Sequence, residues 1–359
     1  MVTAPSLRSD GAGKILARSL EVNLTAHCNL SCYGCDHASP VHPEEFLSVE
    51  ELAKDLAALS AVYHVFEFQL TGGEPLLHPR LLDVVDTIRS SGVADKITLI
   101  TNGVLLHTAP EALWGKIDKL GVSIYPGVKR KLTQEDMETL ANRYGLLLWY
   151  KPTDEFNIKL LHSENGDADL VKAIYSTCTL RNSCHTIHQG RYFKCSPSPF
   201  MGDWLHRVGL EAPPFVRDSV AVRDNPDLQR QLAEYLRDEE PLTACRYCLG
   251  CVGKVIPSRQ MNKAAARQWV SEKDPNIREL IDWDSLADAQ ANLEGVALTG
   301  MLSTMVGRKI RWFVDLWLRR LLGINLTGSP PTTVGLKMRR LLSLPLRSPA
   351  GKDRSQSAL

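Results

Sequence analysis

The chain has 359 residues, of which 44% are hydrophobic and 23% are charged, with a formal net charge of +1. This composition provides for one large core or two ordinary cores and excludes a globally disordered chain. The charge is unevenly distributed, because residues 301–359 contain 11 Lys or Arg but only two acids, Asp315 and Asp353. An acidic body of net charge −8 therefore precedes a basic tail of net charge +9.

The chain contains nine cysteines, an odd number that excludes complete disulfide pairing within one chain. The first 19 residues hold no continuous apolar stretch, so we expect no signal peptide. No window approaches the roughly 18 apolar residues of a membrane span. We therefore expect a cytoplasmic protein, in which clustered cysteines are more often metal ligands or catalytic thiols than disulfides. A disulfide-stapled secreted module and an integral membrane protein are excluded.

The first half of the chain alternates strand-like and helix-like segments. Apolar–polar alternation and short apolar runs predict strands at residues 19–25, 65–71, 96–101, 118–125 and 145–151. Helices are predicted at about 48–61, where Ser48 and Glu51 form a capping-box pattern, and at 79–91 and 132–143. This order is typical of parallel βα units, which bind ligands beyond the carboxyl ends of their strands. The polar or glycine-rich segments 26–40, 72–79 and 102–104 fall at those ends.

Beyond residue 152 the alternation fades. Residues 153–167 are predicted to be loop, residues 190–196 one arm of a hairpin, and residues 197–225, rich in Pro, Gly and Asp, mostly irregular. A helix is predicted at about residues 226–237, shortly before a second group of cysteines.

Cys28, Cys32 and Cys35 form a C-x3-C-x2-C motif in the segment HCNLSCYGCDH. Three thiolates this close on a loop can hold three irons of a cubane cluster and leave the fourth iron open for chemistry. The alternative is a structural zinc site, for which His27 or His37 would supply the fourth ligand.

The motif Gly72-Gly73-Glu74-Pro75 follows the second predicted strand. Paired glycines let the backbone approach a ligand closely, and the Glu74 carboxylate can accept a hydrogen bond from an ammonium group. With CNLSCYGC, TGGEPLLHP and ITNG in this order, residues 17–150 resemble the radical S-adenosylmethionine (SAM) superfamily.

The resemblance implies an α/β fold, a partial (β/α)6 TIM-like barrel, in which Cys28, Cys32 and Cys35 ligate a 4Fe-4S cluster. It implies that SAM chelates the open iron and lies against Gly72, Gly73 and Glu74, with Asn102 and Ser123 as further contacts. Reductive cleavage of SAM would give a 5′-deoxyadenosyl radical that abstracts a hydrogen atom from the substrate.

One position departs from the family pattern. The superfamily usually has an aromatic residue directly before the third cysteine, whereas here Gly34 stands there and Tyr33 precedes it. The aromatic contact to the adenine of SAM, which the family pattern implies, would therefore have to come from Tyr33 at a shifted position. The segments CNLSCYGCDHASP and GGEPLLHP also look like a subgroup associated with carbohydrate and glycan assembly.

A second group of cysteines follows the predicted barrel. Cys178 and Cys195 frame a C-x11-G-x4-C pattern, and Cys245, Cys248 and Cys251 follow in CRYCLGC. This spacing resembles the Twitch or SPASM extension of radical SAM enzymes. The resemblance implies one auxiliary 4Fe-4S cluster held by Cys178, Cys195, Cys245 and Cys248. The alternative is a structural knot of iron or zinc that only stabilises a small irregular domain.

Ligand counting leaves two cysteines, Cys184 and Cys251, outside these two clusters. A spare thiol is either a small buried hydrophobe or a donor that returns a hydrogen atom to a substrate radical. The two roles correspond to two reactions. In a dehydrogenation, the substrate radical loses its electron to the auxiliary cluster. In an epimerisation, a thiol quenches the substrate radical from the opposite face. We place Cys251 first as the donor, since it lies near the proposed ligands, and Cys184 second. His185 and His188 are candidate general bases.

Residues 308–323 in the basic tail can form an amphipathic helix, with Trp317 and Leu321 on the apolar face. This helix either docks on the barrel or lies at a membrane surface with its arginines toward anionic head groups. Nucleic-acid binding is not expected, because the aromatic residues share the apolar face.

The sequence thus predicts three parts: a radical SAM core at residues 1–152, an irregular α+β auxiliary-cluster domain at 153–260, and a helical basic C-terminal part at 261–359. The expected reaction is hydrogen abstraction from a carbinol carbon of a sugar, aminocyclitol or glycan intermediate, followed by epimerisation or dehydrogenation. The expected electron donor is a flavodoxin or ferredoxin. The alternatives are a peptide-modifying maturase and a non-enzymatic iron–sulfur or zinc scaffold protein.

Overall fold

The computed structural model describes residues 8–9 and 13–299 of the chain. The basic tail at residues 301–359, with its predicted amphipathic helix, lies outside these residues. Residues 1–297 form one compact unit, so the predicted boundaries after residues 152 and 260 both fall inside it and stay predictions. Among the described residues, no helix is long and apolar enough to cross a bilayer.

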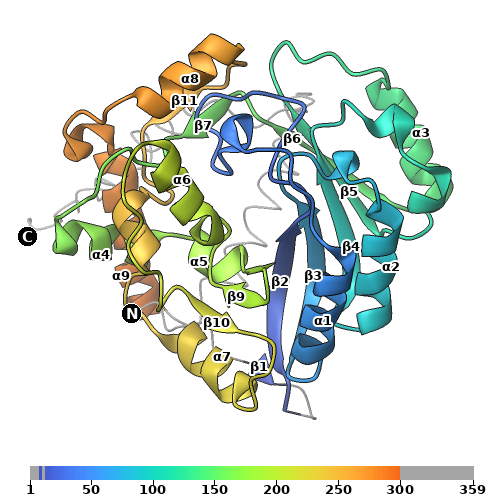
Figure 1. Cartoon of the computed structure of the whole chain (residues 1–359), viewed down its shortest axis with the longest axis horizontal. Helices are drawn as coiled ribbons and strands as arrows, with labels where there is room; N and C mark the ends of the chain where they lie inside the picture. Colours follow the sequence, from blue (N-terminus) through green and yellow to red (C-terminus); the bar gives the residue numbers. More distant parts are fainter. Residues whose placement is uncertain (1–7, 10–12, 300–359) are drawn as a thin grey trace, which may run out of the picture. The chain divides into compact units, whose positions relative to one another are not determined.

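A mostly parallel sheet organises this unit (Figure 1). Its strands lie in the order β10-β9-β8-β2-β3-β4-β5-β6, and the short β1 pairs with β2. The strands are β1 (Arg8–Ser9), β2 (Ile15–Asn23), β3 (Tyr63–Thr71), β4 (Ala94–Thr101), β5 (Lys119–Ile124), β6 (Leu147–Pro152), β8 (Thr186–His188), β9 (Arg191–Phe193) and β10 (Ser219–Ala221). Strands β2 to β6 are parallel neighbours in chain order, which confirms the predicted α/β fold.

The α-helices are α1 (Val49–Ser60), α2 (Leu81–Ser91), α3 (Gln134–Tyr144), α4 (Ala168–Thr177), α5 (Leu180–Ser183), α6 (Met201–Arg207), α7 (Leu228–Arg237), α8 (Lys263–Ser271) and α9 (Trp283–Thr299). Ser48 caps α1 by accepting a hydrogen bond from the amide of Glu51, as the capping pattern predicts. The apolar faces of α1 and α2 belong to the same buried cluster as strands β2 to β5. Burial of these faces fixes the two helices on the sheet.

The sixth parallel strand, β8, lies beside β2 and not beyond β6. The amide of Glu21 in β2 donates to the carbonyl of His185, and the hydroxyl of Thr186 donates to the carbonyl of Glu21. These bonds satisfy backbone groups at the edge of β2 that would otherwise have no partner in the sheet. The auxiliary cysteine region is thereby attached to the first barrel strand.

Two segments are more regular than the sequence predicts. The predicted loop at 153–167 contains β7 (Glu155–Asn157), which pairs with β11 (Val255–Pro257). The predicted irregular stretch at 197–225 contains α6, whose Trp204 is fully buried among residues of α8. Long-range packing stabilises both elements, so local composition did not reveal them.

Candidate functional site

The three cysteines of the first motif lie on the loop that follows β2, at the carboxyl ends of the parallel strands. The Cys28 Sγ atom accepts from the amide of Leu30 at 3.4 Å and lies 3.7 Å from Nδ2 of Asn102. The Cys32 Sγ atom accepts from Nε2 of Gln260 at 3.1 Å. Burial raises the pKa of Cys28 to about 12 and that of Cys32 to about 11, and the neighbouring thiols of the motif add to both shifts. The loop therefore brings the predicted ligands together.

The spacing of these thiols favours a cluster over a single zinc ion. Zinc–sulfur bonds of about 2.3 Å bring tetrahedral ligand atoms within about 4 Å of each other. Within residues 8–9 and 13–299, one group of three potential metal ligands has its ligand atoms within 4.8 Å of one another. This group is Cys35, Asp36 and His37. Cys28 and Cys32 are not in this group, so the donor set fits the wider cage of an iron–sulfur cluster. Within the same loop, Nδ1 of His27 and Nε2 of His37 are buried without a hydrogen-bond partner.

The Gly-Gly segment after β3 packs directly against the cysteine loop. The amide of Gly73 donates to the carbonyl of Thr25 at 2.9 Å. A Cβ atom at Gly73 would lie 1.9 Å from the carbonyl oxygen of His27, the residue before Cys28. Glycine is therefore required at position 73 by a close approach of two backbones. The Gly-Gly-Glu motif, which is predicted to contact SAM, therefore also fixes the position of the cysteine loop.

Glu74 lies at the centre of a buried hydrogen-bond network. One carboxylate oxygen accepts from the hydroxyl of Thr101 and the amide of Leu76, and the other accepts from the amide of Asn102. The Asn102 side chain in turn donates to Oδ1 of Asn29 at 2.6 Å, within the cysteine loop. Glu74 and Asn102 thus connect the ends of β3 and β4 to the loop. Of the Glu74 carboxylate, only Oε2 keeps capacity for a further donor.

The other two predicted cofactor contacts, Ser123 and Tyr33, take part in further interactions around the loop. The carbonyl of Ser123, at the end of β5, accepts from Arg130, which also donates to the carbonyl of Asn102 and so links β5 to β4. The Tyr33 ring lies under the guanidinium of Arg259, and its hydroxyl donates to Glu272 at the end of α8. No spacing signal in the sequence pointed to Arg130 or Gln260.

The four predicted auxiliary ligands line one cavity. Cys178 follows α4, Cys195 follows β9, and Cys245 and Cys248 come from the segment after α7. All four thiols lie on the wall of this cavity, which we call the thiol cavity. Burial raises the pKa of Cys245 and Cys195 above the ordinary thiol value, and each is raised further by neighbouring thiols. Chain segments separated by up to 70 residues thus meet as the pattern predicts.

Cations surround the thiol cavity. Arg181 lines it, and its Nε atom is buried without a hydrogen-bond partner in the described structure. The Lys194 ammonium is buried beside Cys245, and desolvation lowers its pKa to about 8. A cluster held by four thiolates carries negative charge, which such cations would offset. The cavity therefore fits an anionic cluster.

The two spare cysteines occupy different surroundings. Cys251 lies with the auxiliary thiols: its Sγ atom is 3.4 Å from the Thr179 hydroxyl and in hydrogen-bond contact with Cys178. Burial raises the pKa of Cys184 to about 11, and the negative charges of Glu21, Asp36 and the Cys251 thiolate add to this shift. Cys251 lies next to the proposed ligands, as its position in the sequence suggests. No sequence pattern predicted the residues that surround Cys184.

A half-buried ion pair lies between the two groups of cysteines. Lys159 donates to Asp36 at 2.8 Å, and Asp36 directly follows Cys35. The positive charge of Lys159 also acts on the thiols of Cys248 and Cys251. This charged region between the two sites is a candidate environment for a polar substrate.

His185 has a structural role. Its Nδ1 atom is 2.6 Å from the Tyr192 hydroxyl, and its Nε2 atom is 3.1 Å from the carbonyl of Arg181. Burial lowers the His185 pKa to about 4, so the ring is neutral at pH 7. Both ring nitrogens are occupied, which leaves no free nitrogen to serve as a base. The His188 ring packs against Phe200.

Glu21 gives a pH-dependent prediction. Burial raises its pKa from 4.5 to about 6, although His37 and Ser196 oppose the shift. The folded chain then holds a proton that the unfolded chain releases above about pH 4.5, so stability falls as pH rises to about 6 and stays lower above it. We expect Glu21→Gln to gain about 2 kcal/mol over the wild type between pH 4.5 and pH 7.5, measured by denaturant unfolding. The exposed Glu211→Gln control should show no such difference, and an equal response of the two variants would contradict the prediction.

Comparison with known sequences agrees with this geometry. A family model described as the Radical SAM superfamily matches residues 22–129. A probable GTP 3′,8-cyclase of Methanocaldococcus jannaschii is 30% identical over 131 residues, which are 35% of this chain and 43% of the relative. The GTP 3′,8-cyclase of Microcystis aeruginosa is 35% identical over 105 residues, which are 26% of this chain and 30% of the relative. The chain spans less than half the length of these relatives.

Solved structures were compared as well. Native anSMEcpe with bound AdoMet aligns over 80% of this chain and 98% of that chain, with 14% identity and a TM-score of 0.43. BtrN in complex with AdoMet and 2-DOIA aligns over 51% of this chain and 74% of that chain, with 17% identity and a TM-score of 0.35. On the family match and the three-cysteine loop, the chain carries a domain of the Radical SAM superfamily over residues 22–129, whose cofactors are a 4Fe-4S cluster and SAM.

Proposed function

We propose that this protein is a radical SAM enzyme that removes a hydrogen atom from a carbinol carbon of a sugar, aminocyclitol or glycan intermediate. The observation that carries this proposal is the polar, charged region between the two groups of cysteines. Lys159, Asp36 and Glu21 provide hydrogen-bonding groups of both signs there, which suits a substrate with several hydroxyl groups. When bound, the first cluster and SAM supply the radical that takes the hydrogen atom.

The outcome of the reaction depends on the groups that face the substrate. In an epimerisation, the Cys184 thiol donates a hydrogen atom to the opposite face of the carbon, and an external reductant restores the thiol with one electron and one proton. In a dehydrogenation, the hydroxyl proton would pass to a base, and the auxiliary cluster held by the thiol cavity would accept the second electron of the substrate. Glu21, with a pKa of about 6, is suited to accept that proton.

The auxiliary cluster belongs to the same proposal. Cys178, Cys195, Cys245 and Cys248 would hold it in the thiol cavity, with Arg181 supplying a neighbouring cation. Reduction by a flavodoxin or ferredoxin and contact of the basic tail with an anionic membrane surface remain proposals about partners. We do not propose GTP cyclisation for this protein, because the similarity to the GTP 3′,8-cyclases extends over about a third of the chain.

The first test separates an enzyme from a scaffold protein. The reduced, anaerobic protein should convert SAM to 5′-deoxyadenosine, and candidate glycosides should increase this conversion. A protein that binds both clusters and forms no 5′-deoxyadenosine would contradict the proposal.

The hydrogen donor is tested by turnover of candidate glycosides in deuterated water. We expect solvent deuterium at an inverted carbon of the product, and we expect Cys184→Ala to lose it, because the charges of Glu21 and Asp36 in the polar region act on this thiol. Mass spectrometry and NMR of the product measure the incorporation.

Cys251→Ala is the matched control, since its thiol lies among the auxiliary ligands. It should retain deuterium incorporation if its iron content is unchanged. If only Cys251→Ala loses deuterium incorporation, Cys251 is the hydrogen donor, as expected from the sequence. A ketone product without deuterium would replace the epimerisation by the dehydrogenation.

A further inference from the structure

A second pocket lies beside the cysteine loop, outside the site described so far. Its walls come from the cysteine loop, from the 3-10 helix η1 (Ser39–Val41), from the end of α6 and from the start of α8. Its volume is about 760 Å³, within the usual size range of small-molecule sites. The lining residues are Ser31, Pro40, Val41, Arg207, Met261, Asn262, Lys263, Ala266, Arg267 and Val270. We call it the cationic pocket.

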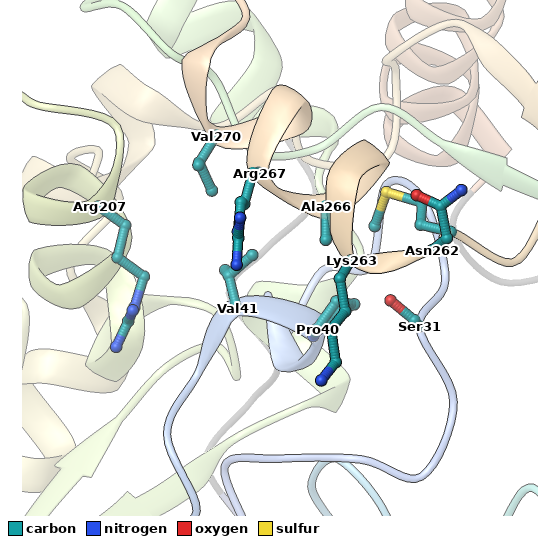
Figure 2. A pocket seen from close by; sticks show the side chains of 10 residues that line it. Ser31, Pro40, Val41, Arg207, Asn262, Lys263, Ala266, Arg267 and Val270 are labelled. Carbon is teal, nitrogen blue, oxygen red and sulfur yellow. The ribbon is translucent and has the colours of Figure 1, made fainter.

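Among the described residues, three cations and no carboxylate line this pocket. Arg207 ends α6, whereas Lys263 and Arg267 lie one turn apart on α8. Figure 2 shows Lys263 and Arg267 extending from α8 toward the segment that carries Pro40 and Val41, with Arg207 of α6 on the left side of this segment. Within residues 8–9 and 13–299, none of the three side chains forms a hydrogen bond or an ion pair. Three cations without a described partner thus line one pocket, although residues 1–300 carry a net charge of −8.

The placement of Lys263 opposes local helix chemistry. Lys263 is the first residue of α8, and its first turn contains no acid. A helix N-terminus favours negative charge, so cations at this end are locally unfavourable. The cost is offset if the pocket takes up an anion, which both the cations and the helix end would attract.

The floor of the pocket is apolar. Met261 and Ala266 are buried, and Val41 and Val270 are half-buried. An inorganic ion would leave this surface uncovered, whereas an organic phosphate covers it with its non-polar part. Arginine guanidinium groups bind phosphate oxygens in pairs, and three cations match the charge of a diphosphate.

We propose that the cationic pocket binds a phosphate-bearing small molecule with an apolar or aromatic portion, whose phosphate oxygens contact Arg207, Lys263 and Arg267. The pocket is tied to the first cysteine loop, since the Met261 amide donates to the Ser31 carbonyl at 2.6 Å. This site goes beyond the proposed function and does not depend on it, because binding is measured without SAM cleavage.

The test uses the full-length protein, purified anaerobically with its metal. Titration calorimetry measures the binding of uridine diphosphate and of inorganic pyrophosphate. Acetylation of lysines, followed by peptide mass spectrometry, reports on Lys263 itself and so separates this pocket from the basic tail. We expect uridine diphosphate to bind more tightly than pyrophosphate, and both to slow acetylation of Lys263 at least fivefold.

The double variant Arg207→Gln/Arg267→Gln should weaken uridine diphosphate binding at least tenfold. Its matched control is Arg18→Gln/Arg237→Gln, which removes two exposed cations elsewhere and should bind like the wild type. Circular dichroism confirms that both variants fold. Equal affinities of the two double variants, or full acetylation of Lys263 at saturating ligand, would overturn the proposal.

A vesicle arm distinguishes the source of the phosphate. Vesicles of phosphatidic acid in phosphatidylcholine should leave Lys263 accessible to acetylation. Protection by these vesicles, but by neither soluble ligand, would assign the pocket to a lipid head group and overturn its assignment to a soluble molecule.

Discussion

Gly73→Ala is expected to lose the iron of the first cluster and to destabilise the fold by about 2 kcal/mol or more. The added Cβ would lie 1.9 Å from the carbonyl oxygen of His27 and 3.0 Å from the amide of Cys28. These neighbours are backbone atoms, so the cysteine loop itself must move, and such overpacking typically costs about 1–3 kcal/mol. A displaced loop no longer presents Cys28 together with Cys32 and Cys35. Iron analysis and denaturant unfolding measure the two effects.

Gly115→Ala is the control for this substitution. Gly115 is exposed, and a Cβ there meets no atom within 4 Å. We expect this variant to keep its iron and to change stability by less than about 0.5 kcal/mol. If Gly73→Ala behaves in the same way, the close approach of the two loops does not position the cluster.

The second large effect concerns the auxiliary site. The full protein should contain about eight irons, four in each cluster, and Cys195→Ser should reduce this to about four. Cys195 lies in the thiol cavity with three further thiols, and a serine hydroxyl is a poor ligand for a cluster. Iron and sulfide analysis, with electron paramagnetic resonance of the reduced protein, would show one cluster signal lost and the other kept.

Cys184→Ser is the matched control, because Cys184 is a half-buried thiol that does not line the thiol cavity. It should retain about eight irons. An equal loss in the two variants would show that iron content follows general destabilisation. Unchanged iron in Cys195→Ser would favour Cys251 as a ligand, since Cys251 lies in contact with Cys178.

Much of the barrel could be predicted from the sequence. Five parallel strands occur where apolar alternation and short apolar runs predict them, with bounds that differ by a few residues, as β3 at Tyr63–Thr71 illustrates. These patterns are local consequences of burying one face of a helix or both faces of a strand. The ligand motifs could also be predicted from the sequence. Cluster ligands need thiols at short fixed spacing, and the close approach of two backbones needs glycine at position 73.

Other features depended on packing between distant segments. Trp204 is buried against Trp269, 65 residues later, and this contact stabilises α6 in a stretch whose composition predicted irregular structure. Lys159 meets Asp36 across 123 residues, and Gln260 meets Cys32 across 228. Neither pair has a spacing pattern, because no rule of helix or strand periodicity relates residues so far apart.

The sequence by itself determined the chemistry of this protein: the three thiols of the first loop, the Gly-Gly-Glu turn, and the supply of cysteines for a second site. These are properties of residue type and short spacing, which local geometry fixes. Only the tertiary structure brought the charge of Glu21 to Cys184 and the Cys251 thiol into contact with Cys178, because both contacts join segments far apart in the chain. The meeting of Arg207 with Lys263 and Arg267 was likewise decided by the packing of α6 near α8. Burial and charge at these positions arise from contacts between segments far apart in the chain, and the sequence encodes those contacts only collectively.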